Sequence, residues 1–291
     1  MVATDFFEKT RSMLEMIKFS HTIFAFPFAL MGVVLAALAN QSLPGLGQVF
    51  WICVAMVGAR SGAMGLNRLI DARIDAENPR TAERHIPAGK IRIRDAWVFI
   101  VASLVIFLLA AWMLNPLCFK LAPVAIGLFV LYAYCKRFTA MAHVVLGICL
   151  AAAPIGAWIA LRGDLGLSVI FLGLAVLFWV AGFDIFYALQ DVDYDQDKGL
   201  FSVPSKLGVE RSIQLVRIFH CLMLFFLLLV LPGSGLGWIY FVGVFVVAAM
   251  LYYEHRLVKV DDLSKLDAAF FNMNGYISVT IFVFTLIDAV T

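Results

Sequence analysis

Long apolar segments alternate with short polar connections along most of the chain. A helix needs about 20 mostly apolar residues to cross a bilayer, and nine segments come close to that length. They lie near residues 19–40, 46–66, 96–115, 118–135, 141–161, 167–189, 213–231, 236–253 and 269–289. The strict alternation typical of an outer-membrane barrel is absent. The pattern therefore predicts an all-α, polytopic membrane protein with nine transmembrane helices.

The composition supports a membrane protein. Hydrophobic residues make up 63% of the chain and charged residues 14%, whereas a soluble domain is about half apolar. The mean hydropathy is +0.94. No low-complexity segment or long linker interrupts the pattern, so we expect one membrane-embedded domain over residues 1–291. We expect the lipid bilayer as its surroundings, with no nucleic-acid partner and no obligate protein partner.

Basic residues are distributed unevenly over the connections between segments. The alternate connections contain only Lys120 and Arg162. The connection between the second and third segments alone contains Arg68, Arg73, Arg80, Arg84, Lys90, Arg92 and Arg94. Connections rich in Lys and Arg stay in the cytoplasm. We therefore expect a protein of the bacterial inner (cytoplasmic) membrane, with its N-terminus and its polar site loops on the cytoplasmic side.

Two polar clusters with the same spacing stand at the ends of apolar segments. A carboxylate at membrane depth costs about 2.5–3.5 kcal/mol, so four of them without compensation would cost about 10 kcal/mol. Cations or water must therefore reach these acids, which makes them candidates for a functional site. The clusters are Asn67-x3-Asp71-x3-Asp75 and Tyr187-x3-Asp191-x3-Asp195.

The spacing of four residues places the side chains of each cluster on one helical face. Oxygen ligands without His or Cys suit a hard cation such as Mg²⁺, which typically takes one or two carboxylates and completes its shell with water and phosphate oxygens. The candidate metal ligands are Asn67, Asp71, Asp75, Asp191 and Asp195. The alternative is an ordinary solvated loop in which the acids pair with nearby arginines such as Arg68 and Arg73.

Other polar residues lie inside or beside apolar segments. Arg60 stands about two turns inside the second segment, where an arginine needs a partner. It either binds the carboxylate of an aromatic acid or pairs with an acid such as Asp184. We expect His143 and His220 to be core residues with a satisfied hydrogen bond, and His255 to lie in a surface loop.

Three stretches of the sequence resemble one family. The run NRLIDARIDAENPRTAERHIPAG (67–89) resembles the first signature of the UbiA superfamily of intramembrane aromatic prenyltransferases, and FDIFYALQDVDYDQDKGLFSVPSKLG (183–208) resembles the second. The stretch YAYCKRFT (132–139) resembles the basic loop between the fourth and fifth helices of that family. One departure is His85, where many members carry Pro, and it leaves the identity of the aromatic acceptor open.

The resemblance implies a fold and roles for individual residues. It implies helices bundled around a central cavity that opens to the cytoplasmic side. The implied catalytic residues are Asp71, Asp75, Asp191 and Asp195, with Mg²⁺ as the cofactor. The implied residues for binding diphosphate or substrate are Asn67, Lys136, Arg137, Arg60, Arg80 and Tyr187.

The resemblance also implies a reaction. Members transfer a polyprenyl group from an allylic polyprenyl diphosphate to a ring carbon of an aromatic acid, here of the 4-hydroxybenzoate type in quinone biosynthesis. Prenylation of a dihydroxynaphthoate on a menaquinone route is the alternative within this class. An ion-coupled transporter is the alternative from another class, because acids inside the membrane are typical of transporters as well. A purely structural membrane subunit is a third possibility.

Overall fold

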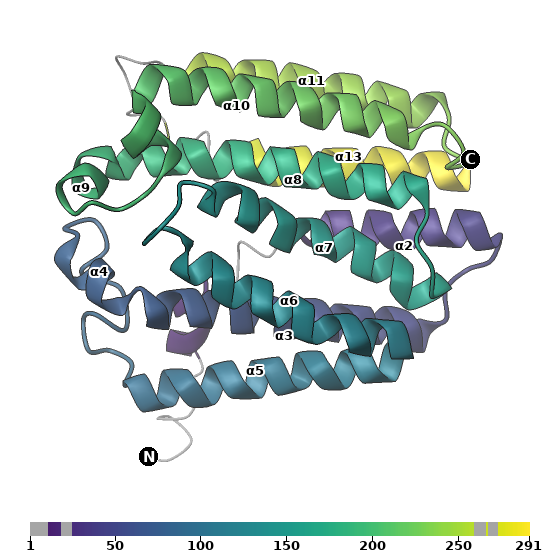
Figure 1. Ribbon diagram of the computed structural model, residues 1–291. Coiled ribbons are helices and arrows are strands. Elements are labelled where there is room, and N and C mark those ends of the chain that lie inside the picture. The colour runs from purple at the N-terminus through teal and green to yellow at the C-terminus, as the bar shows by residue number, and fades with distance from the viewer. Residues whose placement is uncertain (1–10, 19–24, 259–265, 267–272) are drawn as a thin grey trace. The chain divides into compact units, whose positions relative to one another are not determined.

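The computed structural model describes residues 11–18, 25–258, 266 and 273–291, and all regular secondary structure in these ranges is helical (Figure 1). The all-α prediction is therefore confirmed. The long helices are α2 (Phe26–Asn40), α3 (Leu46–Ile70), α5 (Ile93–Leu114), α6 (Pro116–Cys135), α7 (Ala142–Arg162), α8 (Leu167–Ala188), α10 (Val203–Val230), α11 (Trp238–Leu257) and α13 (Asn274–Val290). Three short helices follow α3 or α8, namely α4 (Ala72–Glu77), η2 (Leu189–Asp191) and α9 (Val192–Asp197).

Seven helices in the described part of the chain are long and apolar enough to cross a membrane. The two that fall short are α2 and α13, with 15 and 17 residues. Each lies beside residues outside the described ranges, and the first and last predicted segments, 19–40 and 269–289, include such residues. The described part of every predicted segment overlaps a helix, while the count of nine membrane crossings stays a prediction.

The largest difference from the predicted boundaries is at α10. The sequence pattern placed its start near residue 213, but helical residues begin at Val203, with a break at Gly208, whose φ of 78° and ψ of 169° are not helical. Ser202 forms a capping box with Ser205, and Pro204 occupies a position in the first turn where proline is well tolerated. The capping box and Pro204 mark the start of α10. Hydropathy does not detect this start, because the first turns of the helix are polar.

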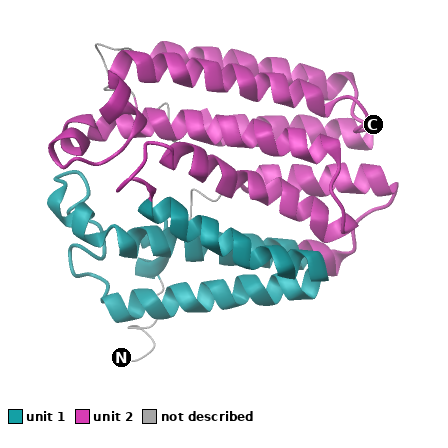
Figure 2. Ribbon diagram, in the orientation of Figure 1, with its two compact units in different colours: residues 1–22, 50–134 teal, residues 23–49, 135–291 magenta. Residues whose placement is uncertain are grey.

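The chain divides into two compact units (Figure 2). The first comprises the described parts of 1–22 and 50–134, and the second those of 23–49 and 135–291. The Asn67–Asp75 cluster belongs to the first unit. The Tyr187–Asp195 cluster and the basic loop belong to the second. The single-domain interpretation stays a prediction.

Close packing of α3 against α5 forms the first unit. Gly58 faces the backbone of α5, where an added Cβ would lie 2.9 Å from both the Ser103 carbonyl oxygen and the Phe107 nitrogen. Gly62 and Gly65 continue this contact against side chains of α5. Small residues on one face allow membrane helices to approach closely. The end of α3, which carries the first polar cluster, is thereby held firmly.

Helix α8 forms the centre of the second unit and is the most buried of the candidate membrane spans. Trp179 packs against Phe28 of α2 and Phe183 of α8, with ring centroids 5.0 Å apart in both pairs. On its other sides α8 contacts α7 and α10. A helix packed on several sides is a rigid support, and the second polar cluster begins at its C-terminal end.

Candidate active site

The first cluster runs along one face where α3 passes into α4. The Asp71 N–H donates to the Asn67 carbonyl at 3.0 Å, and the Asp75 N–H donates to the Asp71 carbonyl at 2.8 Å, so the helical hydrogen bonds continue across the junction. Asn67 Nδ2 donates to Asp71 Oδ2 at 3.2 Å. Asp71 and Asp75 are each only 3% exposed. The predicted column of three oxygen-bearing side chains is present.

Asp75 has two carboxylate oxygens in different situations. Oδ1 accepts a hydrogen bond from Arg84 Nη1 at 2.7 Å in an ion pair. Oδ2 is buried and makes no hydrogen bond within the described part of the chain. The basic partner in this ion pair, Arg84, lies nine residues further along the chain. A buried oxygen with an open coordination position fits a metal-binding carboxylate.

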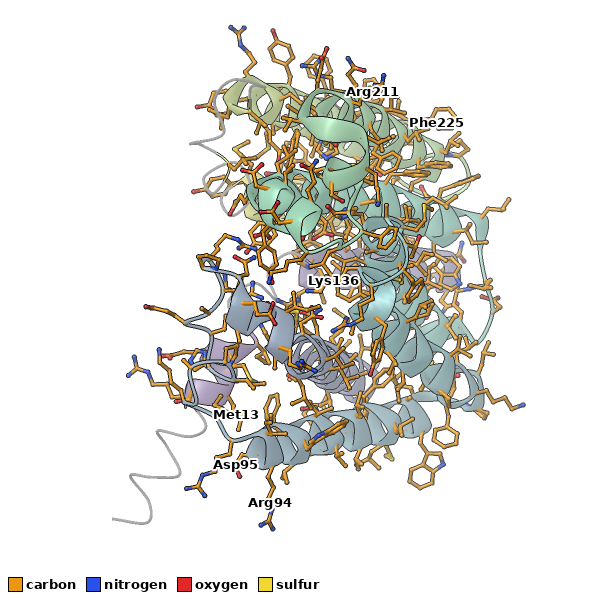
Figure 3. All side chains as sticks on the ribbon, turned by 60° about the vertical axis from the view of Figure 1, so that its left-hand side comes forward. Met13, Arg94, Asp95, Lys136, Arg211 and Phe225 are labelled. Carbon is orange, nitrogen blue, oxygen red and sulfur yellow. The ribbon has the colours of Figure 1, made fainter. Side chains whose placement is uncertain are left out.

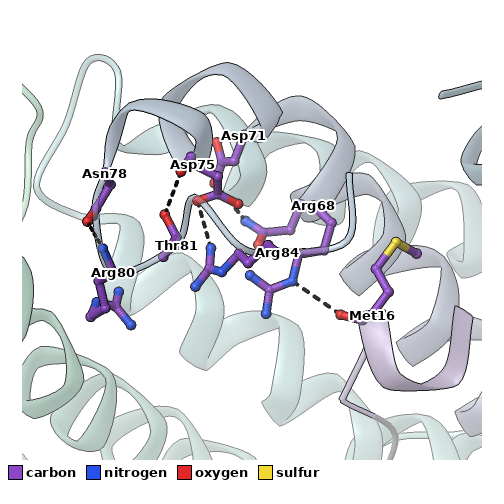
Figure 4. A network of polar contacts seen from close by, with 9 residues as sticks. Met16, Arg68, Asp71, Asp75, Asn78, Arg80, Thr81 and Arg84 are labelled. Carbon is purple, nitrogen blue, oxygen red and sulfur yellow. Dashed lines mark hydrogen bonds and ion pairs between the residues drawn. The ribbon is translucent and has the colours of Figure 1, made fainter. Parts of the chain in front are cut away.

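The loop after α4 folds back over this cluster (Figure 4). Thr81 Oγ1 donates to the Asp75 carbonyl at 3.0 Å, and the Arg80 N–H donates to Asn78 Oδ1 at 2.9 Å. The Arg80 side chain is exposed. His85 Nε2 lies 3.7 Å from a Glu15 carboxylate oxygen, so the residue that departs from the family pattern connects this loop to the segment 11–18.

Two arginines of α3 bind main-chain carbonyls of the segment 11–18. Arg68 Nε donates to the Met16 carbonyl at 3.3 Å, and Arg60 Nη2 donates to the Lys18 carbonyl at 3.5 Å. Arg60 Nε is buried and makes no hydrogen bond within the described ranges. The alternative partner predicted for Arg60, Asp184, belongs to the other unit and bonds to His143 there.

The second cluster spans the end of a long helix and the two short helices that follow it. Tyr187 lies in the last turn of α8, Asp191 ends η2, and Asp195 lies in α9. The chain tightens to a 3₁₀ turn at Leu189–Asp191, so the cluster does not follow the continuous α-helical column that the spacing predicts. The carboxylates of Asp191 and Asp195 nevertheless lie close enough to interact electrostatically.

The basic loop lies beside the second cluster in the same unit. Lys136 and Arg137 form the turn between α6 and α7, and Lys136 is labelled in Figure 3. The Phe201 N–H donates to the Lys136 carbonyl at 2.8 Å. The positive charge of the Lys136 ammonium group attracts the Asp195 carboxylate, and the Ser202 side chain forms a hydrogen bond with that carboxylate. The structure thus brings together Asp191, Asp195 and the predicted basic loop.

The histidines follow the predictions only in part. His143 is 4% exposed and bonds to Asp184, which confirms the expected core residue with a satisfied hydrogen bond. His220 is buried, with Nδ1 3.0 Å from His255 Nε2. The prediction of a surface loop for His255 is wrong, because it lies in α11 and packs against Phe186 and His220.

The donor set fits Mg²⁺ better than a metal held by protein ligands alone. Within the described ranges, no group of three or more His, Cys, Asp or Glu side chains is arranged to hold a metal ion. Magnesium does not require such a cage, since it usually takes one or two carboxylates, with water and phosphate oxygens as its other ligands. Asp71 and Asp75 supply such a pair in one unit, and Asp191 and Asp195 in the other.

Comparison with known proteins identifies the family. The model of the UbiA prenyltransferase family matches residues 25–276. The chain belongs to the UbiA prenyltransferase family. A 4-hydroxybenzoate octaprenyltransferase of Aeromonas hydrophila subsp. hydrophila is 31% identical over 252 residues, which cover 86% of this chain and 87% of the relative.

Solved structures of UbiA proteins share the fold. The apo structure of a UbiA homolog from Aeropyrum pernix K1 is 28% identical, with a TM-score of 0.83 over 92% of this chain and 98% of that one. A UbiA homolog from Archaeoglobus fulgidus bound to DMAPP and Mg²⁺ has a TM-score of 0.72 at 18% identity, over 96% of this chain and 99% of that one. The interpretation as an all-helical, polytopic UbiA membrane protein is confirmed.

Sequence reasoning missed two contacts that shape the site. The ion pair of Arg84 with Asp75 closes a loop of nine residues, and its only signal was the position of Arg84 within the first signature. The contact between His143 and Asp184 joins residues 41 apart, and nothing in their spacing indicates it.

Proposed function

We propose that this chain transfers a polyprenyl group from an allylic polyprenyl diphosphate to a ring carbon of an aromatic acid of the 4-hydroxybenzoate type, in quinone biosynthesis. The observation that carries the proposal is the Asn67–Asp71–Asp75 column, with both carboxylates buried, at the end of a membrane-length helix. The similarity to a 4-hydroxybenzoate octaprenyltransferase over 86% of the chain supports it.

The five metal-ligand candidates keep the roles inferred from the sequence. Bound Mg²⁺ would neutralise the negative charge that develops as the diphosphate leaves. The open oxygen of Asp75 and the hydrogen-bonded column beside it support this use of the first cluster. A UbiA protein of the same fold binds DMAPP together with Mg²⁺. The ligands would be Asn67, Asp71, Asp75, Asp191 and Asp195.

The basic residues bind and orient the substrates. Lys136 and Arg137 bind the diphosphate, because a charged loop beside the Asp191–Asp195 cluster attracts an anion that carries metal ions. Arg80, exposed on the loop over the first cluster, adds a further cation. The guanidinium of Arg60 binds the carboxylate of the aromatic acid, and Tyr187 lines the site from the end of α8.

The reaction breaks the allylic C–O bond and forms a C–C bond at the ring. The diphosphate leaves with the bonding electron pair, the ring carbon attacks the allylic carbon, and the ring then loses a proton to water or to a carboxylate of the site. Apolar helices exclude water, which would otherwise capture the allylic cation. An aromatic face near such a cation would stabilise it by about 0.5–2 kcal/mol.

The proposed location is the bacterial inner membrane, with the N-terminus and both clusters on the cytoplasmic side. The basic connection between α3 and α5 supports this orientation. Divalent ions then reach the site from the cytoplasm and the released diphosphate leaves to it, while the polyprenyl tail lies among apolar helices.

Mass spectrometry of products tests the proposal. Purified protein is incubated with Mg²⁺, one polyprenyl diphosphate and a panel that includes 4-hydroxybenzoate and a dihydroxynaphthoate. We expect prenylated 4-hydroxybenzoate. Prenylation of the naphthoate alone would favour the menaquinone route. Ion flux in vesicles without any prenylated product would favour the transporter.

A further inference from the structure

His143 occupies a buried position near the start of α7. Its Nδ1 lies 2.7 Å from Asp184 Oδ2, and the side chains of His143 and Asp184 are 5% and 18% exposed. Asp184 lies on α8, one turn before Tyr187 of the second cluster. The pair therefore connects α7 to the end of α8 that carries the candidate site.

The other ring nitrogen of His143 contacts a third helix. The Val203 backbone N–H donates to His143 Nε2 at 3.3 Å, and Val203 is the first residue of α10. A backbone N–H can only donate, so Nε2 is the acceptor and the proton lies on Nδ1, where it points at Asp184. The carboxylate of Asp184 thus selects the tautomer that can accept from Val203.

The segment just before Val203 contacts two elements of the candidate site. The Leu200 N–H donates to the Asp195 carbonyl at 2.8 Å, and the Phe201 N–H donates to the Lys136 carbonyl at 2.8 Å. The Ser202 side chain interacts with the Asp195 carboxylate. A displacement at Val203 would therefore shift both Asp195 and the backbone of the basic loop.

We propose that His143 is a positioning residue for diphosphate binding, because it fixes the 200–203 segment between Asp195 and Lys136. The inference rests on the proposed function. His143 does not touch the substrate in this account and acts only through Val203 and Asp184. By holding Val203, it orients the neighbouring groups that contact the ligand.

Three variants distinguish positioning from general stability. His143→Leu removes both hydrogen bonds, whereas His143→Gln keeps one amide donor for Asp184 and one acceptor for Val203. His220→Leu is the matched control, because His220 is another buried histidine of the same unit whose ring bonds to His255. For H143L we expect the KM for polyprenyl diphosphate to rise about tenfold, the order expected for losing a buried hydrogen bond that positions a charged site.

The KM for the aromatic acid should stay unchanged in H143L, and H143Q should recover the KM for diphosphate to within about threefold of the wild type. H220L should lose thermal stability without a change in either KM. An unchanged KM for diphosphate in folded H143L, or an equal increase in H220L, would overturn the inference.

Two further measurements separate this inference from the proposed function. Hydrogen–deuterium exchange of the 200–203 amides should be faster in H143L and near wild type in H143Q. If the wild type forms no prenylated product, the proposed function fails, and Mg²⁺-dependent binding of inorganic diphosphate replaces the KM. Binding about tenfold weaker in H143L supports the inference, and equal binding or unchanged exchange contradicts it.

Discussion

Replacing Arg84 by Gln tests how the first aspartate cluster is held before metal binds. The Arg84–Asp75 ion pair has an N–O distance of 2.7 Å, and its side chains are 24% and 4% exposed. At this distance the attraction is about 6 kcal/mol for an effective dielectric constant of about 20. Lost hydration offsets most of that attraction. We expect a net coupling of about 2–3 kcal/mol in a double-mutant cycle with Asp75→Asn.

The assay is unfolding in mixed micelles, with and without Mg²⁺. Without Mg²⁺, R84Q leaves a buried carboxylate with one cation fewer and should lower the free energy of unfolding by about 2–3 kcal/mol. Added Mg²⁺ should stabilise R84Q more than the wild type, because Arg84 no longer competes for Asp75. A ligand at 100 times its Kd contributes about 2.7 kcal/mol, enough to restore most of the loss.

The matched control is Arg162→Gln. Arg162 forms an ion pair with Asp164 at 3.0 Å, donates to Asn40 Oδ1 at 2.6 Å and lies over the Trp158 ring, and none of these partners belongs to an aspartate cluster. Added Mg²⁺ should stabilise R162Q as much as the wild type. Identical Mg²⁺ stabilisation of R84Q and wild type would refute the reasoning.

Three other variants test separate parts of the account. Gly58→Ala should lower the free energy of unfolding by about 1–3 kcal/mol, because its Cβ would meet the backbone of α5, whereas Gly127→Ala, with open space around it, should be neutral or stabilising. Arg60→Met should raise the KM for the aromatic acid about 10- to 100-fold and leave the KM for polyprenyl diphosphate unchanged; an equal rise in both would contradict carboxylate binding. Asp191→Ala should abolish product formation in a folded protein, as monitored by mass spectrometry, and retention of full activity would exclude its role.

The sequence predicts the elements better than it predicts the contacts between them. The length of the apolar segments predicts each long helix, because a helix needs a minimum apolar length to cross the bilayer. Apolar length misses residues 203–212, which comprise a short helix started by a capping box and a break at Gly208, because Lys206, Glu210 and Arg211 look like a loop. The capping box places the helix start at residue 203, whereas hydropathy places it near residue 213.

Local spacing also predicts local geometry within the candidate site. The spacing of four residues places Asn67 beside Asp71, as their hydrogen bond confirms. The same spacing does not foresee the 3₁₀ turn before Asp191, because packing at the end of α8 decides how tightly the chain winds. Contacts such as His143–Asp184 depend on how helices pack, so a single sequence carries no direct signal for them.

We propose that binding of the diphosphate through Mg²⁺ needs the aspartate cluster of each unit. Calorimetric titration with a non-reactive prenyl thiodiphosphate tests this requirement in the wild type, Asp75→Ala and Asp195→Ala. We predict binding that is lost when Mg²⁺ is removed by EDTA and that is weakened in each variant. Wild-type affinity in either variant, or binding that persists without Mg²⁺, would contradict the requirement.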